Sequence, residues 1–313
     1  MALFTKQVVS LPSNLLKDKY IVPPFSILNT ISQNWQTRKK QWESLGINST
    51  AGRDTKLHNA TPKNTFSARG SGVKIPESIS TFDPLLCEIL IKWFSKPDAV
   101  ILDPFAGGSV RGIVSCALGR QYYGIDLSET QVTQNLAQFE EVSSHYKFNS
   151  RKPEYTIGDS STVLADPNCN IPMADMILTC PPYYNLEKYS NDSADLSNMS
   201  SYDDFLIAYD EILRLAIGKL HTDAFMVIVV SEIRSKSGEY YGFVPDTINI
   251  ARKHGLKYYN EIILENNIGS LPIRAPKYFD QSRKIGRHHQ NILVFYKGDT
   301  KNIESIYGKF SDS

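Results

Sequence analysis

The stretch DMILTCPPYYN, residues 175–185, is the most informative part of this 313-residue chain. Its first four residues indicate a buried strand, and Thr179 and Cys180 follow. Pro181 and Pro182 end the strand, because proline has no backbone N–H for a sheet and restricts the residue before it. The sequence therefore predicts a rigid elbow at the carboxyl end of a strand, the edge at which open α/β sheets bind ligands.

A second strand with a sharply marked end lies upstream, in AVILDPFAGG at residues 99–108. Its four apolar residues indicate a buried strand, and Asp103 and Pro104 end it. Gly107 and Gly108 permit a tight turn and let a ligand come close to the backbone. Two strand ends of this kind predict a site that brings a nucleotide-like cofactor together with a planar substrate.

Strands alternate with helices from about residue 80 onward, which is typical of a doubly wound, mostly parallel sheet. We expect a Rossmann-like α/β domain over residues 76–300. The last two strands, 259–264 and 291–296, have no helix pattern between them and predict an antiparallel hairpin at one edge of the sheet. The other expected elements are helices at 33–45, 84–94, 110–118, 128–141, 202–220 and 245–254, and strands at 100–102, 121–125, 155–157, 176–178 and 225–230.

The composition favours a soluble, cytoplasmic protein. Lys and Arg number 34 and Asp and Glu 33, so a surface that binds a polyanion has to be local. The amino terminus lacks the apolar core of a signal peptide, and no stretch reaches the ~18 apolar residues of a membrane span. The cysteines show neither CxxC pairing nor His-rich spacing, which indicates reduced thiols without a metal site. They are Cys87, Cys116, Cys169 and Cys180.

Residues 1–75 form an extension of different character. Between Arg38 and Lys63 the chain has six basic residues and two acidic ones, and Trp35 and Trp42 lie in or next to this stretch. Basic and aromatic side chains together suit contacts with phosphates and bases. Two hypotheses stay open: an arm that lies over the main domain, or an element that contacts DNA. Beyond the main domain, a C-terminal tail is expected at 301–313.

The order of these motifs resembles that of the S-adenosylmethionine-dependent DNA amino-methyltransferases, which methylate an exocyclic nitrogen of cytosine or adenine. The resemblance covers about residues 80–297. DPFAGG matches the family's cofactor motif DPFxGxG, but Ser109 stands where the family has its last glycine. The resemblance implies S-adenosylmethionine as the cofactor. The residues it implies for cofactor binding are Asp103, Pro104, Phe105, Ala106, Gly107, Gly108, Asp126 for the ribose hydroxyls and Asp159 for the adenine.

The elbow CPPY stands where the family has Asp, Asn or Ser before Pro-Pro-Tyr, which implies catalytic roles for Cys180, Pro181, Pro182 and Tyr183. In the family, the first side chain and the next main-chain carbonyl accept hydrogen bonds from the target amino group and aim its lone pair at the methyl group. The resemblance implies that Pro181 supplies the carbonyl and that Tyr183 stacks on the flipped base.

Cys180 leaves open which atom of the base is methylated. A thiol is a weak acceptor, and in size it is closest to serine, which the family associates mainly with cytosine N4. Cytosine N4 is therefore favoured, with adenine N6 as the alternative. A thiolate at a strand end could also attack C6 of a pyrimidine and so activate cytosine C5 for methylation. The sequence has none of the other landmarks of the C5 enzymes.

A basic segment precedes the last strand. Residues 272–297 contain six basic residues and one acidic residue, Asp280, and such a local positive patch suits phosphate binding. We expect the loop 265–290 to contact double-stranded DNA, with His288 and His289 as an incidental pair rather than metal ligands. The residues implied for nucleic-acid contact are Tyr184, Asn185, Arg274, Lys277, Arg283, Lys284 and Arg287.

Other functions stay open on the sequence alone. The same cofactor and elbow could serve RNA or a protein amide, and Ser109 and Cys180 leave room for a nucleic-acid-binding relative without activity. The polar residues from Asn185 to about Met199 are expected to form a mobile lid or a long loop. Short N-terminal elements resemble bacteriophage methylases, so we expect a protein of a bacterial or phage-infected cell, with or without a partner restriction enzyme.

Overall fold

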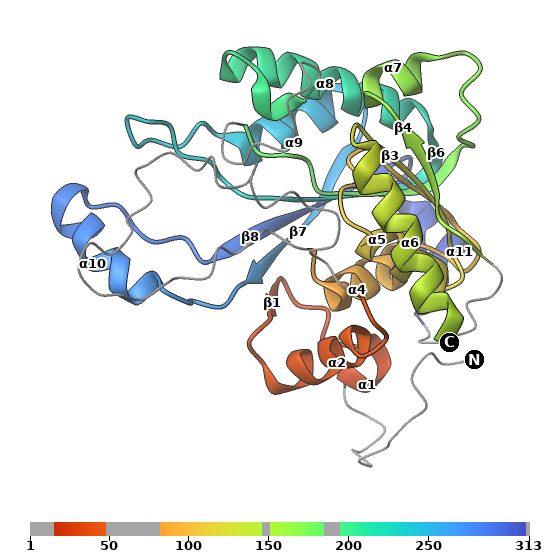
Figure 1. Cartoon of the computed structure of the whole chain (residues 1–313), viewed down its shortest axis with the longest axis horizontal. Coiled ribbons are helices and arrows are strands. Elements are labelled where there is room, and N and C mark those ends of the chain that lie inside the picture. Colours follow the sequence, from red (N-terminus) through yellow and green to blue (C-terminus); the bar gives the residue numbers. More distant parts are fainter. Residues whose placement is uncertain (1–15, 48–81, 146–150, 185–194, 311–313) are drawn as a thin grey trace.

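In a computed structural model, the described residues form one eight-stranded sheet with helices on both faces (Figure 1). The structure describes residues 16–47, 82–145, 151–184 and 195–310. All neighbouring strands pair in parallel except β8, which is antiparallel to β6 and β7, and this confirms the predicted fold class. The strands are β1 (Ile27–Asn29), β2 (Val100–Asp103), β3 (Gln121–Asp126), β4 (Glu154–Ile157), β5 (Ala174–Thr179), β6 (Leu220–Val230), β7 (Lys257–Glu265) and β8 (His289–Lys297).

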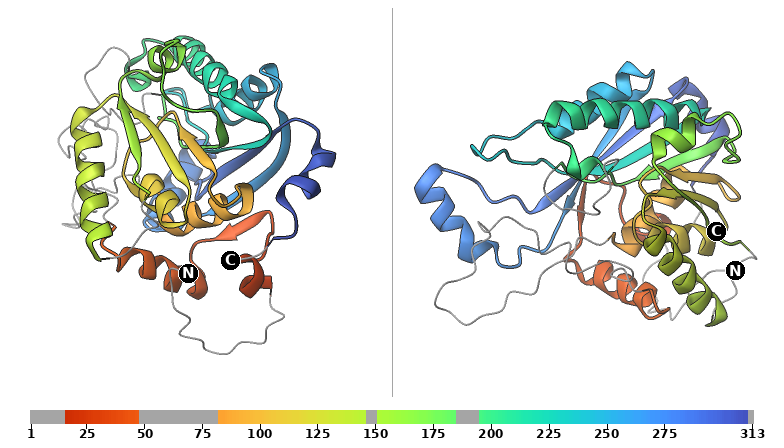
Figure 2. Two further views of the ribbon diagram at one scale, coloured as in Figure 1. Left: turned by 90° about the vertical axis from the view of Figure 1, so that its right-hand side faces the viewer. Right: turned by 45° about the horizontal axis from the view of Figure 1, so that its top comes forward.

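The helices cover both faces of the sheet, as Figure 2 shows from two further sides. Helices α4, α5 and α6 contribute to the apolar core of one face, and α7, α8 and α9 to that of the other. The long apolar run of β6 lies buried between these two layers, as a strand covered on both faces must. The helices are α1 (Leu16–Tyr20), α2 (Gln33–Glu43), α4 (Pro84–Phe94), α5 (Val110–Ala117), α6 (Glu129–His145), α7 (Ser160–Ala165), α8 (Tyr202–Gly218), α9 (Phe243–Lys253), α10 (Leu271–Ser282) and α11 (Ile303–Tyr307).

The strand order creates a point at which the winding of the sheet reverses. The order is β1-β7-β8-β6-β5-β2-β3-β4, so the chain runs from β2 through β3 to β4 on one side and returns to β5 on the other. The carboxyl ends of the adjacent parallel strands β2 and β5 therefore face the same edge of the sheet. In open α/β sheets, ligands bind in the crevice beside such a reversal.

Residues 16–47, the described part of the N-terminal segment, pack against the main domain. Strand β1 extends the sheet by pairing in parallel with β7. On α2, the Trp35 indole donates to the Asp83 carboxylate at 3.1 Å and the Trp42 indole donates to Glu88 at 2.7 Å. Arg38 adds an ion pair of 2.5 Å with the buried Glu88. Both indole rings are thus buried and cannot stack on a base, whereas residues 48–75 lie outside the described residues.

The end of the chain differs from expectation in two respects. The prediction that no helix separates the last two strands, and that 265–290 is a loop, is wrong, because α10 forms there. Its pattern was missed since Pro272 and Pro276 interrupt it and none of its residues is buried. The expected antiparallel pair of β7 and β8 is present, but β1 covers the free side of β7.

The segment predicted to be a tail contains the short helix α11, whose Tyr307 ring lies 5.1 Å from that of Phe225 on β6. These rings tie the end of the described chain to the sheet. Within the described parts of the chain, no helix has both the length and the apolar character needed to cross a membrane.

Candidate functional site

Two loops meet at the reversal of the sheet. We call residues 103–109, from the last residue of β2 to the start of α5, the cofactor loop, and residues 179–184, from the last residue of β5 onward, the target elbow. Strands β2 and β5 are neighbours, with Leu102 paired to Ile177, so the two loops leave the same edge side by side. The sequence motifs that predicted a joint site are therefore together in space.

The Asp103 side chain connects these two loops. It is fully buried, and its Oδ1 accepts a hydrogen bond of 2.7 Å from the Thr179 hydroxyl. Its Oδ2 accepts from the Tyr122 hydroxyl at 2.8 Å and from Arg111 Nε at 2.5 Å. The pKa of Tyr122 is raised, first by burial and then by this carboxylate. Asp103 therefore holds the first residue of the elbow against the cofactor loop.

Arg111 is a residue that the sequence analysis did not single out. Its Nη2 donates to the carbonyls of Phe105 at 2.7 Å and Ala106 at 2.9 Å, in addition to the bond from Nε to Asp103. Its guanidinium also lies 4.7 Å from the centre of the Phe82 ring. One buried cation thus neutralises Asp103 and orders the backbone of the cofactor loop. A charged residue inside the apolar helix VRGIVSCA was the only signal in the sequence.

The cofactor loop is also held against β3 and α6. The N–H of Ala106 donates to the Ile125 carbonyl at 3.0 Å, and the Asn135 amide donates to the Gly107 carbonyl at 2.7 Å. Gly107 has a positive φ of 51°, which favours glycine. Ser109, by contrast, has a φ of −65° and its hydroxyl donates to the Gln138 side chain, so the missing glycine causes no backbone strain here.

Asp126 lies at the end of β3, beside the cofactor loop. One carboxylate oxygen accepts from the Gly107 N–H at 2.7 Å and the other from the Ser128 N–H at 2.8 Å. Burial raises the pKa of Asp126 to about 6, although both N–H groups act in the opposite direction. Each oxygen keeps a further lone pair. The carboxylate is thus fixed in position and still able to accept hydrogen bonds from a diol, which fits a ribose.

Asp159 lies at the end of β4, where its carboxylate caps α7 by accepting from the Thr162 N–H at 2.9 Å. Burial alone would raise its pKa, but hydrogen bonds from Ser161 and Thr162 lower it. The next residue, Ser160, donates to the Pro104 carbonyl at 2.5 Å. The turn predicted to lie beside the adenine therefore contacts the cofactor loop directly.

In the target elbow, Cys180 is half-buried and Pro181 is buried. Tyr183 is buried as well, with its ring edge-on to Phe243 at 6.2 Å between ring centres. Its hydroxyl accepts a hydrogen bond of 3.3 Å from the Gln290 amide on β8. These contacts fix the orientation of the ring. At 6% exposed, however, Tyr183 is as buried as Tyr184, so a base can stack on it only after neighbouring side chains move off its face.

Tyr184 points into an aromatic cluster. Its ring centre lies 5.7 Å from those of Tyr202 and Phe205 and 5.6 Å from that of Tyr241, and it is 7% exposed. In this structure the side chain supports the elbow from within the core instead of offering a surface to DNA. Asn185, the next predicted contact, lies outside the described residues.

The basic residues of the segment before β8 differ in exposure. Arg287 is partly buried, and its side chain donates to the Ser231 hydroxyl at 3.0 Å and to Asn291. Arg274, Lys277 and Arg283 are exposed. Lys284 is half-buried, and its Nζ lies against the backbone of Gly238. The three exposed side chains lie at the surface, where Arg283 also pairs with Asp280, whereas Arg287 holds the protein's own loops.

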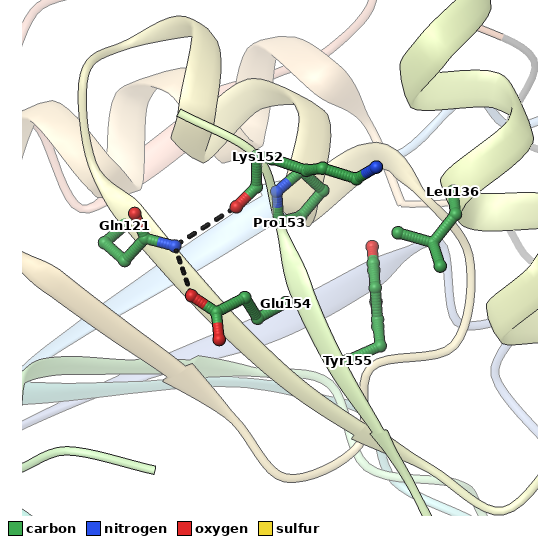
Figure 3. Close-up of a pocket in the computed structure, with 6 residues that line it drawn as sticks. All are labelled: Gln121, Leu136, Lys152, Pro153, Glu154 and Tyr155. Carbon is green, nitrogen blue, oxygen red and sulfur yellow. Dashed lines mark hydrogen bonds between the residues drawn. The ribbon is translucent and has the colours of Figure 1, made fainter. Parts of the chain in front are cut away.

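A surface hollow of about 550 Å³ lies elsewhere on the domain (Figure 3). It is lined by residues that include Gln121 and Glu154, the first residues of β3 and β4, and by Tyr155. It therefore lies at the edge opposite to the cofactor loop. Among the described residues, no group of three or more His, Cys, Asp or Glu side chains is placed to hold a metal ion.

Comparison with known proteins identifies the family of the chain. The family model of DNA methylases, the N6/N4 methyltransferases, matches residues 19–138 and 174–312. No curated protein sequence matches the chain.

Solved structures with a similar fold include TrmN from Thermus thermophilus, at 15% identity and a TM-score of 0.43 over 69% of this chain and 49% of TrmN. The chain thus spans about half the length of TrmN. A TehB-like S-adenosylmethionine-dependent methyltransferase from Corynebacterium glutamicum is 18% identical, with a TM-score of 0.40 over 67% of this chain and 86% of that one.

A DNA modification methylase candidate of Thermus thermophilus, in complex with S-adenosylmethionine, is 22% identical, with a TM-score of 0.34 over 45% of this chain and 54% of that one. Membership rests on the family match, which extends over most of the sheet and both loops of the site. The chain therefore belongs to the N6/N4 DNA methylase family, and its cofactor is S-adenosylmethionine.

Proposed function

We propose that this protein transfers a methyl group from S-adenosylmethionine to the exocyclic amino nitrogen of a base in double-stranded DNA, with cytosine N4 as the favoured acceptor. The observation that carries the proposal is the Thr179–Asp103 hydrogen bond of 2.7 Å, which joins the target elbow to the cofactor loop. Together with the family match, it supports a site in which donor and acceptor are held by one buried network.

Different residues would hold the two reactants, the cofactor and the target base. Asp126 and the backbone of the cofactor loop would hold the cofactor, which supplies a methyl group on a positively charged sulfur. The Pro181 carbonyl and the Cys180 side chain would accept hydrogen bonds from the target amino group and direct its lone pair. This nitrogen would take the methyl group from the cofactor, which leaves as the neutral thioether, and the nitrogen would release a proton to water. The rate is gained from positioning and electrostatic preorganisation.

The base must leave the helix to reach the elbow, because its amino group is paired within the duplex. Tyr183 would stack on the extruded base. Incubation with duplex DNA and S-adenosylmethionine, followed by digestion to nucleosides and mass spectrometry, tests the reaction. N4-methylcytosine is the expected product. N6-methyladenine alone would refute the preference for cytosine, and 5-methylcytosine alone would refute transfer to an amino nitrogen.

The Cys180→Ser variant is expected to keep or increase methyl transfer. A hydroxyl is a better hydrogen-bond acceptor than a thiol and has nearly the same size. The measurement is the initial rate of transfer to duplex DNA, with Cys169→Ser as the control for a thiol outside the site. A covalent mechanism through Cys180 predicts the opposite result, a complete loss of transfer in the serine variant.

Affinity for S-adenosylmethionine is expected to fall as pH falls through about 6, the raised pKa of Asp126. The ionised carboxylate accepts hydrogen bonds from the ribose hydroxyls, and protonation removes part of this capacity. The free energy of unfolding depends on pH in the opposite direction. Because the folded pKa lies above the ordinary value of 3.8, the protein loses stability as pH rises between these two values, and the contribution is constant above about 6.

Calorimetric titration of the cofactor at several pH values checks this prediction. Asp126→Asn should bind more weakly than the native protein at neutral pH and show a flat pH profile in the same range. A wild-type affinity that does not change across pH 6 would refute the role of Asp126 as the hydroxyl acceptor.

A further inference from the structure

Helix α10 exposes an unusual apolar surface. None of its residues is buried. Ile273 is 82% exposed and Ile285, just after the helix, is 74% exposed. Tyr278 and Phe279 are 39% and 46% exposed. Figure 1 shows α10 projecting from the domain at the far end of β7 and β8. Exposed apolar patches on a soluble protein commonly mark interaction sites.

This surface extends from the edge of the sheet that carries the candidate site. Residues 266–288 connect the carboxyl end of β7 to the start of β8, and β8 runs antiparallel to both β6 and β7. The carboxyl ends of β5, β6 and β7 therefore lie at the same edge of the sheet. Gln290, just after this segment, donates to the Tyr183 hydroxyl of the target elbow at 3.3 Å. A ligand seated on α10 would lie along the same edge as the elbow.

Charge indicates the kind of partner. Arg274, Lys277 and Arg283 accompany the apolar side chains, and the acidic residue of the helix, Asp280, lies 4.0 Å from Arg283. Ile273 and Lys277 are four residues apart and so share one face of the helix. A face that combines a cation with a protruding aliphatic side chain suits a phosphate backbone and the base stack next to it. The apolar core of a protein–protein interface is instead depleted of lysine.

We propose that α10 is an apolar wedge for duplex DNA, in which Ile273 and Ile285 press against the base stack beside the target while the basic residues hold phosphates. This inference rests on the proposed function. Apolar side chains inserted between base steps unstack and kink the duplex. A wedge at this position lowers the work of extruding the target base, which otherwise costs a few kcal/mol in unstacking and unpairing.

The test is fluorescence anisotropy with a short random-sequence duplex at a series of salt concentrations. The double variant Ile273→Ala/Ile285→Ala is expected to bind about tenfold more weakly with an unchanged salt slope, because only apolar contact is lost. Lys277→Ala should lower the slope by about one. Ile207→Ala is the matched control, because this isoleucine is 70% exposed and belongs to α8, which lies apart from α10 in Figure 1. It should bind as the wild type does.

Binding of the double variant within twofold of the wild type would overturn the proposal. So would sedimentation of the wild type as a dimer and of the double variant as a monomer, since the surface would then belong to a second copy. A different result would refute the proposed function. If the wild type binds duplex DNA through α10 but transfers no methyl group, the proposed reaction is refuted and the proposal about α10 stands. Methyl transfer with unimpaired binding by the double variant refutes the wedge alone.

Discussion

Replacing Arg111 with alanine is expected to lower the free energy of unfolding by about 3–5 kcal/mol, the range for breaking a buried ion pair by removing one partner. The buried Asp103 carboxylate would lose its cation, and the carbonyls of Phe105 and Ala106 would lose a donor. Both of these carbonyls belong to the cofactor loop. The affinity for S-adenosylmethionine should therefore fall together with the stability. Urea unfolding and calorimetric titration of the cofactor measure the two effects.

Two further variants distinguish the effect of Arg111 on the cofactor loop from a general loss of stability. Arg111→Lys keeps the charge but not the planar fork that serves Asp103 and two carbonyls together, so it should regain part of the stability and little of the cofactor affinity. Arg214→Ala removes an exposed arginine from its pair with Glu211 and should leave the melting temperature and the affinity unchanged. Wild-type cofactor affinity in a folded Arg111→Ala protein would show that this arginine does not order the loop.

The network around Asp103 explains which parts of the site were predictable from sequence. Prolines and glycines mark strand ends locally, and parallel strands collect their carboxyl ends at one edge, so the cofactor loop and the target elbow could be placed together without coordinates. The partner of Asp103 could not be predicted, because a charged residue in the apolar helix VRGIVSCA suggests an inward-facing arginine but does not show which carboxylate it meets. Side-chain pairs across elements are decided by packing, which the sequence pattern does not display.

The same limit applies to the N-terminal segment. Trp35 and Trp42, interleaved with basic residues, suggested a possible contact with DNA, yet both indoles donate to acidic residues next to or on α4. Glu88 lies buried in the apolar helix PLLCEILIKWF, and only the folded structure shows that it meets Arg38 and Trp42. Helix α10 was missed for a different reason: Pro272 and Pro276 interrupt its pattern, and none of its residues is buried.

Replacing Tyr183 with leucine is expected to reduce kcat/KM for methyl transfer about 10- to 100-fold, because stacking of a base on an aromatic ring is worth ~1–3 kcal/mol. Leucine keeps an apolar side chain against Phe243, so most of the packing remains, whereas the flat face for the base is lost. Tyr183 is not among the residues proposed to hold the cofactor. Affinity for S-adenosylmethionine should therefore be unchanged, and the defect should appear with DNA only.

Tyr183→Phe distinguishes the ring from its hydroxyl. It removes the 3.3 Å hydrogen bond from Gln290 but keeps the stacking surface, and it should retain most of the wild-type rate. If the phenylalanine variant were as impaired as the leucine variant, the hydroxyl and its tie to β8 would be the functional element. If the leucine variant transferred methyl groups at the wild-type rate, the base would not stack on Tyr183. The structure favours the ring, because the edge-on contact with Phe243 fixes its orientation whether or not the hydroxyl is present.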